Sequence, residues 1–171
     1  MVVLRRTAKL SSILPLSGSA TAVSGTALGD WNVNRIVVDR RPLLLLVSAN
    51  ALLPIVLPAR DVQSLPERLP ECVAARLRRL RIPTAVIAAE VKAMDPIVVA
   101  PTNNRSVVGI MVDFAKGVPF HLDPGAWDDT SLPFVEARLA ETPCHAGRRF
   151  DEVIFPEQKA PELLLARWGA G

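Results

Sequence analysis

The chain has 171 residues, a length suited to one domain that buries about 70% of its unfolded surface without disulfides or metals. Half of the residues are hydrophobic and the mean hydropathy is +0.28, which is high for a soluble protein. Each apolar segment therefore has to be tested as a transmembrane helix. The net charge of +3 is uneven, with 13 Lys and Arg against 6 Asp and Glu in residues 1–94, and 7 against 11 in residues 95–171. A nucleic-acid face on the first half would explain this polarity, but we favour two halves that neutralise each other within the fold.

The amino terminus is expected to form a strand at Val2–Leu4 and a short helix that begins near Thr7. Its basic residues and the apolar stretch after them imitate a secretory signal. Ser11, Ser12 and Pro15 interrupt that apolar stretch, which argues against a signal peptide.

A loop near residues 17–29, rich in Gly, Ser and Ala, follows. It lacks the Gly-Lys-Ser/Thr ending of a phosphate-binding loop, so we interpret it as a flexible connection. Three apolar runs come next, at Val33–Asp39, Leu43–Val47 and Leu52–Leu57, and their turn-forming separators predict an antiparallel meander with a central strand covered on both faces. The run Pro42–Pro58 is short for a transmembrane helix and is interrupted by polar residues and Pro, so two strands explain it better.

Two helices are predicted after the meander, at Pro70–Arg81 and Thr84–Met94. Four basic residues crowd the carboxyl end of the first helix: Arg76, Arg78, Arg79 and Arg81. The helix dipole favours cations there, so a solvated helix end is the first interpretation. A patch that contacts the phosphates of a nucleic acid is the alternative.

A strand at Ile97–Ala100 leads into a polar turn and then a helix over residues 104–117 with apolar residues on one face. The turn contains Thr102, Asn103, Asn104, Arg105 and Ser106. Free amide hydrogens at the helix start, together with the arginine, suit a phosphate or carboxylate ligand. The alternative is that an Asn only caps the helix and that the arginine pairs with a nearby acid.

Further candidates lie outside this turn. Asp30, Trp31 and Asn32 stand at the entrance to the meander, where the indole would either stack on a ligand or seal the end of the sheet. Asp113 lies on the predicted helix over residues 104–117, either as a partly enclosed carboxylate or as a solvent-facing one.

Thiol and zinc chemistry are both disfavoured. Cys144 beside His145 suggests thiol catalysis, but sequence neighbours in extended chain rarely point at each other, and His121 is the only other histidine. The two cysteines and two histidines also lack the paired spacing of a zinc site, so we expect no metal and no cofactor. Two thiols in a chain of this size fit a reduced, cytoplasmic protein.

The chain is expected to end with a helix at Ser131–Glu141 and a loosely packed tail from about residue 151, with a short helix at Pro161–Trp168. Several segments resemble a family of small bacterial proteins classed as a domain of unknown function: Gly29-Asp30-Trp31, Leu52-Leu53-Pro54, Thr102 with Asn104 to Val107, Asp113-Phe114, and Leu139 to Cys144. Relatives carry Asn before the Asp-Phe pair, where this chain has Val112. The resemblance covers most of the chain, implies a compact domain, and implies no activity, cofactor or catalytic residue.

We therefore expect an α+β fold in a single domain over residues 1–171, with a small, mainly antiparallel sheet, a meander plus one further strand, packed against several helices. The leading functional hypothesis is a noncatalytic binding or interaction protein, regulatory or associated with nucleic acid, with a nucleic acid or a protein as partner. Its ligand site would comprise Asp30, Trp31, Asn32, Thr102, Asn103, Asn104, Arg105 and Ser106. The alternative is a small hydrolase or nuclease that uses Asn104, Arg105 and Asp113.

Overall fold

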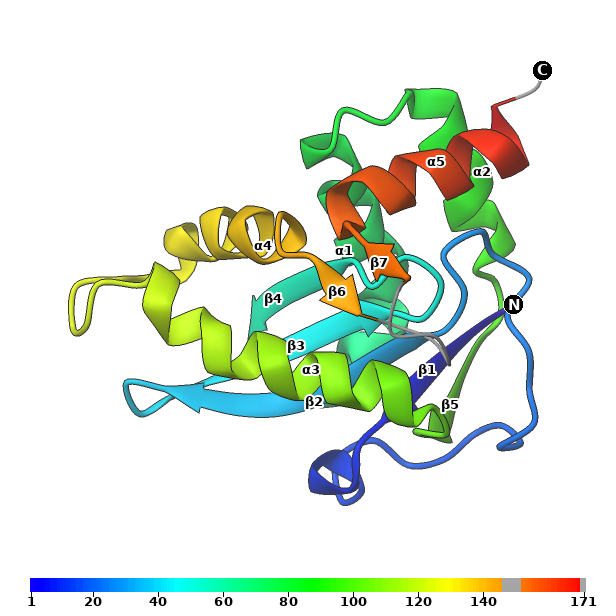
Figure 1. Cartoon of the computed structure of the whole chain (residues 1–171). Coiled ribbons are helices and arrows are strands. Elements are labelled where there is room, and N and C mark those ends of the chain that lie inside the picture. The colour runs from blue at the N-terminus through cyan, green and yellow to red at the C-terminus, as the bar shows by residue number, and fades with distance from the viewer. Residues whose placement is uncertain (146–151, 170–171) are drawn as a thin grey trace.

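A computed structural model describes residues 1–145 and 152–169, in which helices cover both faces of a five-stranded sheet (Figure 1). The strands are β1 (Val2–Arg6), β2 (Trp31–Val38), β3 (Arg41–Ser48), β4 (Pro54–Pro58) and β5 (Ile97–Pro101), in the order β4-β3-β2-β1-β5. The β2–β3 and β3–β4 pairs are antiparallel, whereas β1 pairs parallel with both β2 and β5. The predicted α+β class with a mainly antiparallel sheet is confirmed, but the meander is joined by two further strands rather than one.

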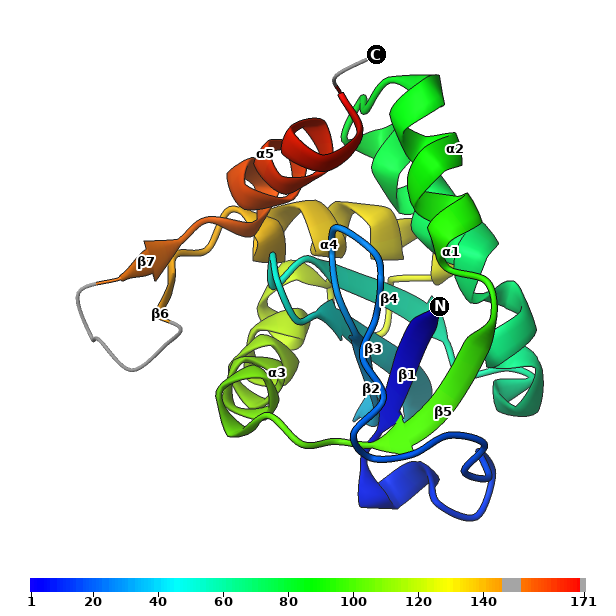
Figure 2. The ribbon, with the colours of Figure 1, turned by 90° about the vertical axis from the view of Figure 1, so that its right-hand side faces the viewer.

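The helices are α1 (Leu65–Arg79), α2 (Thr84–Ala93), α3 (Arg105–Gly117), α4 (Leu132–Ala140) and α5 (Pro156–Trp168). Four short 3-10 segments, η1 (Ala8–Leu10), η2 (Val62–Ser64), η3 (Val118–His121) and η4 (Asp129–Ser131), and a small hairpin of β6 (Cys144–His145) and β7 (Val153–Ile154) complete the described elements. Figure 2 shows α3 on one face of the sheet and α1 with α2 on the other.

Two predicted helix starts need correction or qualification. Helix α1 begins at Leu65 rather than Pro70, because Pro66 fills the first turn, where no helical hydrogen bond is lost, and Pro70 is then accommodated inside the helix. The start of the expected tail near residue 151 lies outside the described residues. Helix α5, which follows, begins at Pro156 and not at Pro161.

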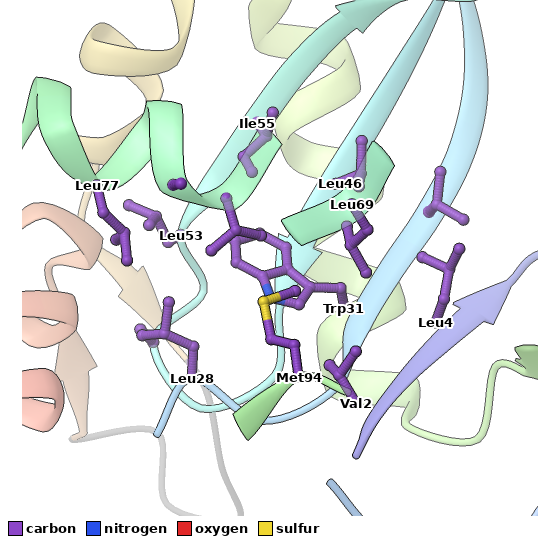
Figure 3. Packing of buried hydrophobic residues seen from close by; sticks show 14 of the residues in the cluster. Val2, Leu4, Leu28, Trp31, Leu46, Leu53, Ile55, Leu69, Leu77 and Met94 are labelled. Atoms are coloured by element: carbon purple, nitrogen blue, oxygen red, sulfur yellow. The ribbon is translucent and has the colours of Figure 1, made fainter. Parts of the chain in front are cut away.

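The central strand β3 is buried on both faces, as its sequence predicts. Leu44 and Leu46 belong to the cluster beneath α1 and α2, while Leu43 and Leu45 belong to the cluster beneath α3 and α4. Figure 3 shows the first cluster, in which Trp31 lies in the middle of the packed side chains. The helices that the apolar middle strand requires are therefore present on both sides.

Both outer strands of the sheet have their free edges covered by other parts of the chain. At β4, the Arg76 guanidinium donates to the carbonyl of Pro54 at 3.0 Å, and the amide of Val56 donates to the Glu136 carboxylate at 2.9 Å. At β5, the amide of Val99 donates to the Ser17 hydroxyl, and its carbonyl accepts from the Ser17 amide. Unpaired backbone N–H and C=O groups at an open edge can pair with a strand of another chain. At these positions the groups are already hydrogen-bonded within the chain.

The apolar run at Pro42–Pro58 forms most of β3, a turn and β4 rather than one helix. Within the described residues, every helix is too short or too polar to traverse a lipid bilayer.

Candidate functional site

The polar residues at the start of β2 are buried and do not offer a ligand surface. Trp31 is 1% exposed and Asn32 is 0% exposed, because α1 and α2 cover one face of the strand and the opposite face is enclosed as well. Trp31 therefore packs in the core and is not free to stack on a ligand, which corrects that expectation. The side-chain amide nitrogen and oxygen of Asn32 have no hydrogen-bond partner among the described residues.

A buried arginine joins the two predicted polar groups. Arg5, in β1, forms an ion pair with Asp30 and donates to the carbonyl of Pro101, the residue before the polar turn. The same guanidinium donates to the carbonyls of Ala20 and Ala22 in the loop between β1 and β2. Arg5 is 2% exposed, so this cluster fastens three segments of the chain together and leaves no opening for a ligand.

The start of α3 is closed by its own capping residue. The side-chain oxygen of Asn104 accepts from the amides of Ser106 and Val107 at 3.0 and 3.2 Å. Arg105 is exposed and forms no ion pair within the described part of the chain. Two of the amide donors that an anion would need are thus already satisfied.

The three residues of the hydrolase hypothesis do not meet in one site. Asp113 lies nine positions beyond Asn104 on the same straight helix, which is roughly 13 Å along the axis. A catalytic group and its partner have to approach within hydrogen-bond reach. The two ends of α3 are therefore separate environments.

The arginines of α1 are largely occupied by acids. Arg76 and Arg79 both pair with Glu136 of α4, at 3.6 and 2.6 Å, and Arg78 pairs with Glu71 at 3.0 Å. Burial lowers the pKa of Arg76 and the Glu136 charge opposes that effect. Arg81 lies two residues beyond the end of α1, in the left-handed region with φ of 59°. The first, basic half of the chain is thus matched in part by the acidic second half, as in the neutralisation hypothesis.

A cavity of about 210 Å³ lies at the other end of α3, between this helix, the end of α4 and β6. Figure 1 shows β6 descending from the end of α4 towards α3. The lining residues come from four elements and the segment before β6: Ile110, Asp113, Phe114, Gly117, His121, Leu139, Thr142, Pro143, Cys144 and His145. The α3 members follow one face of the helix at spacings of three, one and three residues.

Gly117 sets how closely α3 approaches α4 at this cavity. A Cβ atom at this position would lie 3.3 Å from a methyl carbon of Leu139, a contact that requires the leucine to shift. The glycine therefore permits close packing of the two helices beside the cavity.

The chemistry of the cavity favours binding over nucleophilic catalysis. Burial and the Asp113 carboxylate raise the pKa of Cys144 to about 11, and its Sγ donates to the carbonyl of Thr142 at 3.5 Å. Because the thiolate is the nucleophile, a thiol held in the protonated form is unreactive at neutral pH. Within residues 1–145 and 152–169, no three His, Cys, Asp or Glu side chains are arranged to hold a metal ion.

Larger hollows on the surface offer weaker recognition. One of about 520 Å³ is lined by Arg41, Arg60, Asp128 and Asp129. Its charges are engaged locally, since Arg60 pairs with Asp129 at 2.8 Å and Arg41 stacks over Trp127 at 4.8 Å. The lining of the cavity beside α3, by contrast, contains both histidines of the chain and the Asp113 carboxylate.

Sequence reasoning named these residues but did not place them together. From the sequence, His121, Cys144 and His145 enter only the thiol and zinc hypotheses, and Asp113 enters only the hydrolase hypothesis, together with Asn104 and Arg105. The residues are distant in sequence and come from different elements, so no local spacing indicated their meeting. The single local signal was the helical periodicity that puts Asp113 on the same face as Ile110 and Phe114.

Comparison with known proteins identifies a family but not a function. The family described as Domain of unknown function (DUF6933) matches residues 3–159. No curated protein and no solved structure matches the chain. The resemblance expected from the sequence motifs is confirmed.

Proposed function

Because the chain belongs to the DUF6933 family, whose function is unknown, we propose from the site alone that this protein is a noncatalytic binding protein for a small ligand. The observation that carries the proposal is the cavity between α3, α4 and β6, whose mainly apolar lining also contains Asp113, His121 and His145. Such a hollow, largely apolar with a few convergent polar groups, is the usual form of a small-molecule site.

The size of the cavity limits the ligand. A volume of about 210 Å³ corresponds to roughly seven water molecules at their share of liquid volume. Ile110, Phe114 and Leu139 supply the apolar contacts, and each of the three side chains is buried in the α3–α4 cluster. The ligand is therefore a small molecule with an apolar body and one polar end.

The remaining hypotheses have less support. A nucleic-acid face on α1 would have to use arginines that already pair with Glu136 and Glu71. A hydrolase at the start of α3 would have to recruit Asp113 from the opposite end of the helix. A cytoplasmic location accompanies the binding proposal, since Cys72 and Cys144 are both free thiols.

The proposal is tested with three probes that each have a linear chain of six carbon atoms and differ in their polar group: n-hexylamine, hexanoate and 1-hexanol. The chain has two histidines and both line the cavity, so their imidazole NMR signals report on it. His121 also lines a neighbouring hollow of about 520 Å³, so the signal of His145 distinguishes binding in the cavity from binding next to it. We expect at least one probe at millimolar concentration to shift both imidazole signals in a saturable manner.

A blocked variant and its neighbour control the experiment. Thr142→Trp places an indole at the lining of the cavity and is expected to weaken the best probe about tenfold or more, whereas Glu141→Trp, at an adjacent exposed position that does not line it, leaves the affinity unchanged. Equal affinities for the two variants, or no saturable shift with any probe, contradict the proposal.

A further inference from the structure

The charges around the cavity select among small ligands. Among the described residues, Asp113 is the only formally charged member of its lining when both histidines are neutral, and no described Lys or Arg contributes to it. Asp113 is exposed and forms no ion pair with any of the described residues. The described part of the lining therefore carries one carboxylate charge without a paired cation.

Asp113 acts on the inside of the cavity and not only on the solvent around it. Its charge is the smaller of the two causes, after burial, that raise the pKa of Cys144, whose buried thiol lines the same cavity. A carboxylate among the lining residues that influences another group of the lining also attracts a cation that enters the cavity.

The neutral part of the lining suits the body of such a cation. Phe114 lies one position beyond Asp113 and is 3% exposed, while Ile110 and Leu139 complete the apolar wall. An aromatic and aliphatic wall beside a carboxylate combines apolar contact with charge pairing. An anionic ligand of the same shape would meet the Asp113 charge, and no cation among the described lining residues would offset it.

Resting on the proposed function, we propose that the ligand is a small organic cation, a primary amine with a short apolar body, whose ammonium group pairs with Asp113. The nearest cation on the same helix is Lys116, which does not line the cavity and leaves the carboxylate available. The cation at the start of the helix, Arg105, is more than two turns away.

The test compares the three hexyl probes on the full chain by NMR titration at pH 8, above the range in which free imidazole is charged. n-Hexylamine is expected to bind about tenfold more tightly than 1-hexanol, and hexanoate more weakly than either. The ranking is measured on the unmutated protein, so it does not depend on the folding of any variant.

Two isosteric variants assign the preference to one side chain. Asp113→Asn is expected to weaken n-hexylamine about tenfold and to change 1-hexanol by less than about twofold. Asp123→Asn removes the same charge from an exposed residue that lines only the neighbouring hollow, and it leaves both affinities unchanged. A preference for the amine that persists in Asp113→Asn overturns the inference.

The probe set also separates the inference from the proposed function. Binding of hexanoate or 1-hexanol at least as tight as that of n-hexylamine rejects the cation alone and leaves a neutral or anionic ligand. Absence of binding by all three probes rejects both.

Discussion

Arg76 and Glu136 lie where two helices and the edge of the sheet meet. They are 2% and 1% exposed, and each also hydrogen-bonds the backbone of β4. Arg79 approaches the same carboxylate from a partly exposed position. A buried ion pair adds little over an apolar pair of the same shape, but removal of one partner leaves an uncompensated buried charge. The identity of Arg76 is therefore explained by structure rather than by contact with nucleic acid.

We predict that Arg76→Met lowers the free energy of unfolding by about 2 kcal/mol, because it removes one of the two guanidinium partners of the buried Glu136 carboxylate and the donor to the carbonyl of Pro54. Arg78→Met, on the same helix, loses only an exposed pair with Glu71 and is expected to cost less than about 1 kcal/mol. Urea denaturation of the two variants measures the difference. Equal losses would show that the buried network does not stabilise the fold.

Single residues also show where prediction from sequence stops. Trp31 was expected at the rim of the sheet because polar neighbours surround it in sequence, yet it is the centre of a core cluster. The polarity of Asp30 is satisfied internally by Arg5, which lies in a strand that the sequence does not link to it. A polar group is buried where it finds hydrogen-bond partners, and these partners can be distant in the sequence. The local sequence pattern therefore does not predict such burial.

At the scale of elements, α3 was the most predictable part of the chain. Its apolar spacing and its Asn cap indicated a helix over residues 104–117, and the structure has it at Arg105–Gly117. The start of α1 was missed because Pro70 was placed in the first turn, whereas Pro66 occupies it. A proline marks a helix start only when no other proline precedes it within the helix.

We predict that Asn104→Ala lowers the free energy of unfolding by about 1 kcal/mol, since it removes the acceptor for the amides of Ser106 and Val107. Asn103→Ala, one residue earlier and outside the helix, is expected to change it by no more than a few tenths. Thermal melts of both variants, with and without sulfate, provide the measurement. A loss in Asn103→Ala as large as that in Asn104→Ala would contradict the capping role of Asn104. A sulfate-dependent stabilisation that is larger in Asn104→Ala than in the unmutated protein would show that the freed amides at the helix start bind an anion.

At the scale of the whole molecule, the sequence predicted the meander and the helices that cover both faces of its central strand. It did not predict the placement of β1 and β5. Strand β1 pairs parallel with β2 through a connection that passes along the edge of β5, where Ser17 bonds to Val99. Parallel pairing between distant segments leaves no turn signature, unlike the hairpins of the meander. The sheet class was therefore predictable, while its two parallel strands required the structure.

The cavity is likewise a property of the assembled chain. The second half of α3, the segment after α4 and the hairpin strand β6 each contribute lining residues, and only their packing creates the cavity. Of the predicted candidates, Asp113 belongs to this cavity, whereas Asn104 and Arg105 remain at the far end of the helix. A site at the start of α3 and a site in the cavity thus predict ligand contacts at different residues of the same helix.

Backbone amide NMR of the full chain, titrated with the tightest-binding hexyl probe, distinguishes those two sites directly. The cavity account predicts saturable shifts at residues 110–117 and 139–145 together, with residues 102–106 and 30–34 unaffected. Shifts concentrated at residues 102–106, with Ile110 to Gly117 and Leu139 to His145 unmoved, would contradict it and return the site to the start of α3.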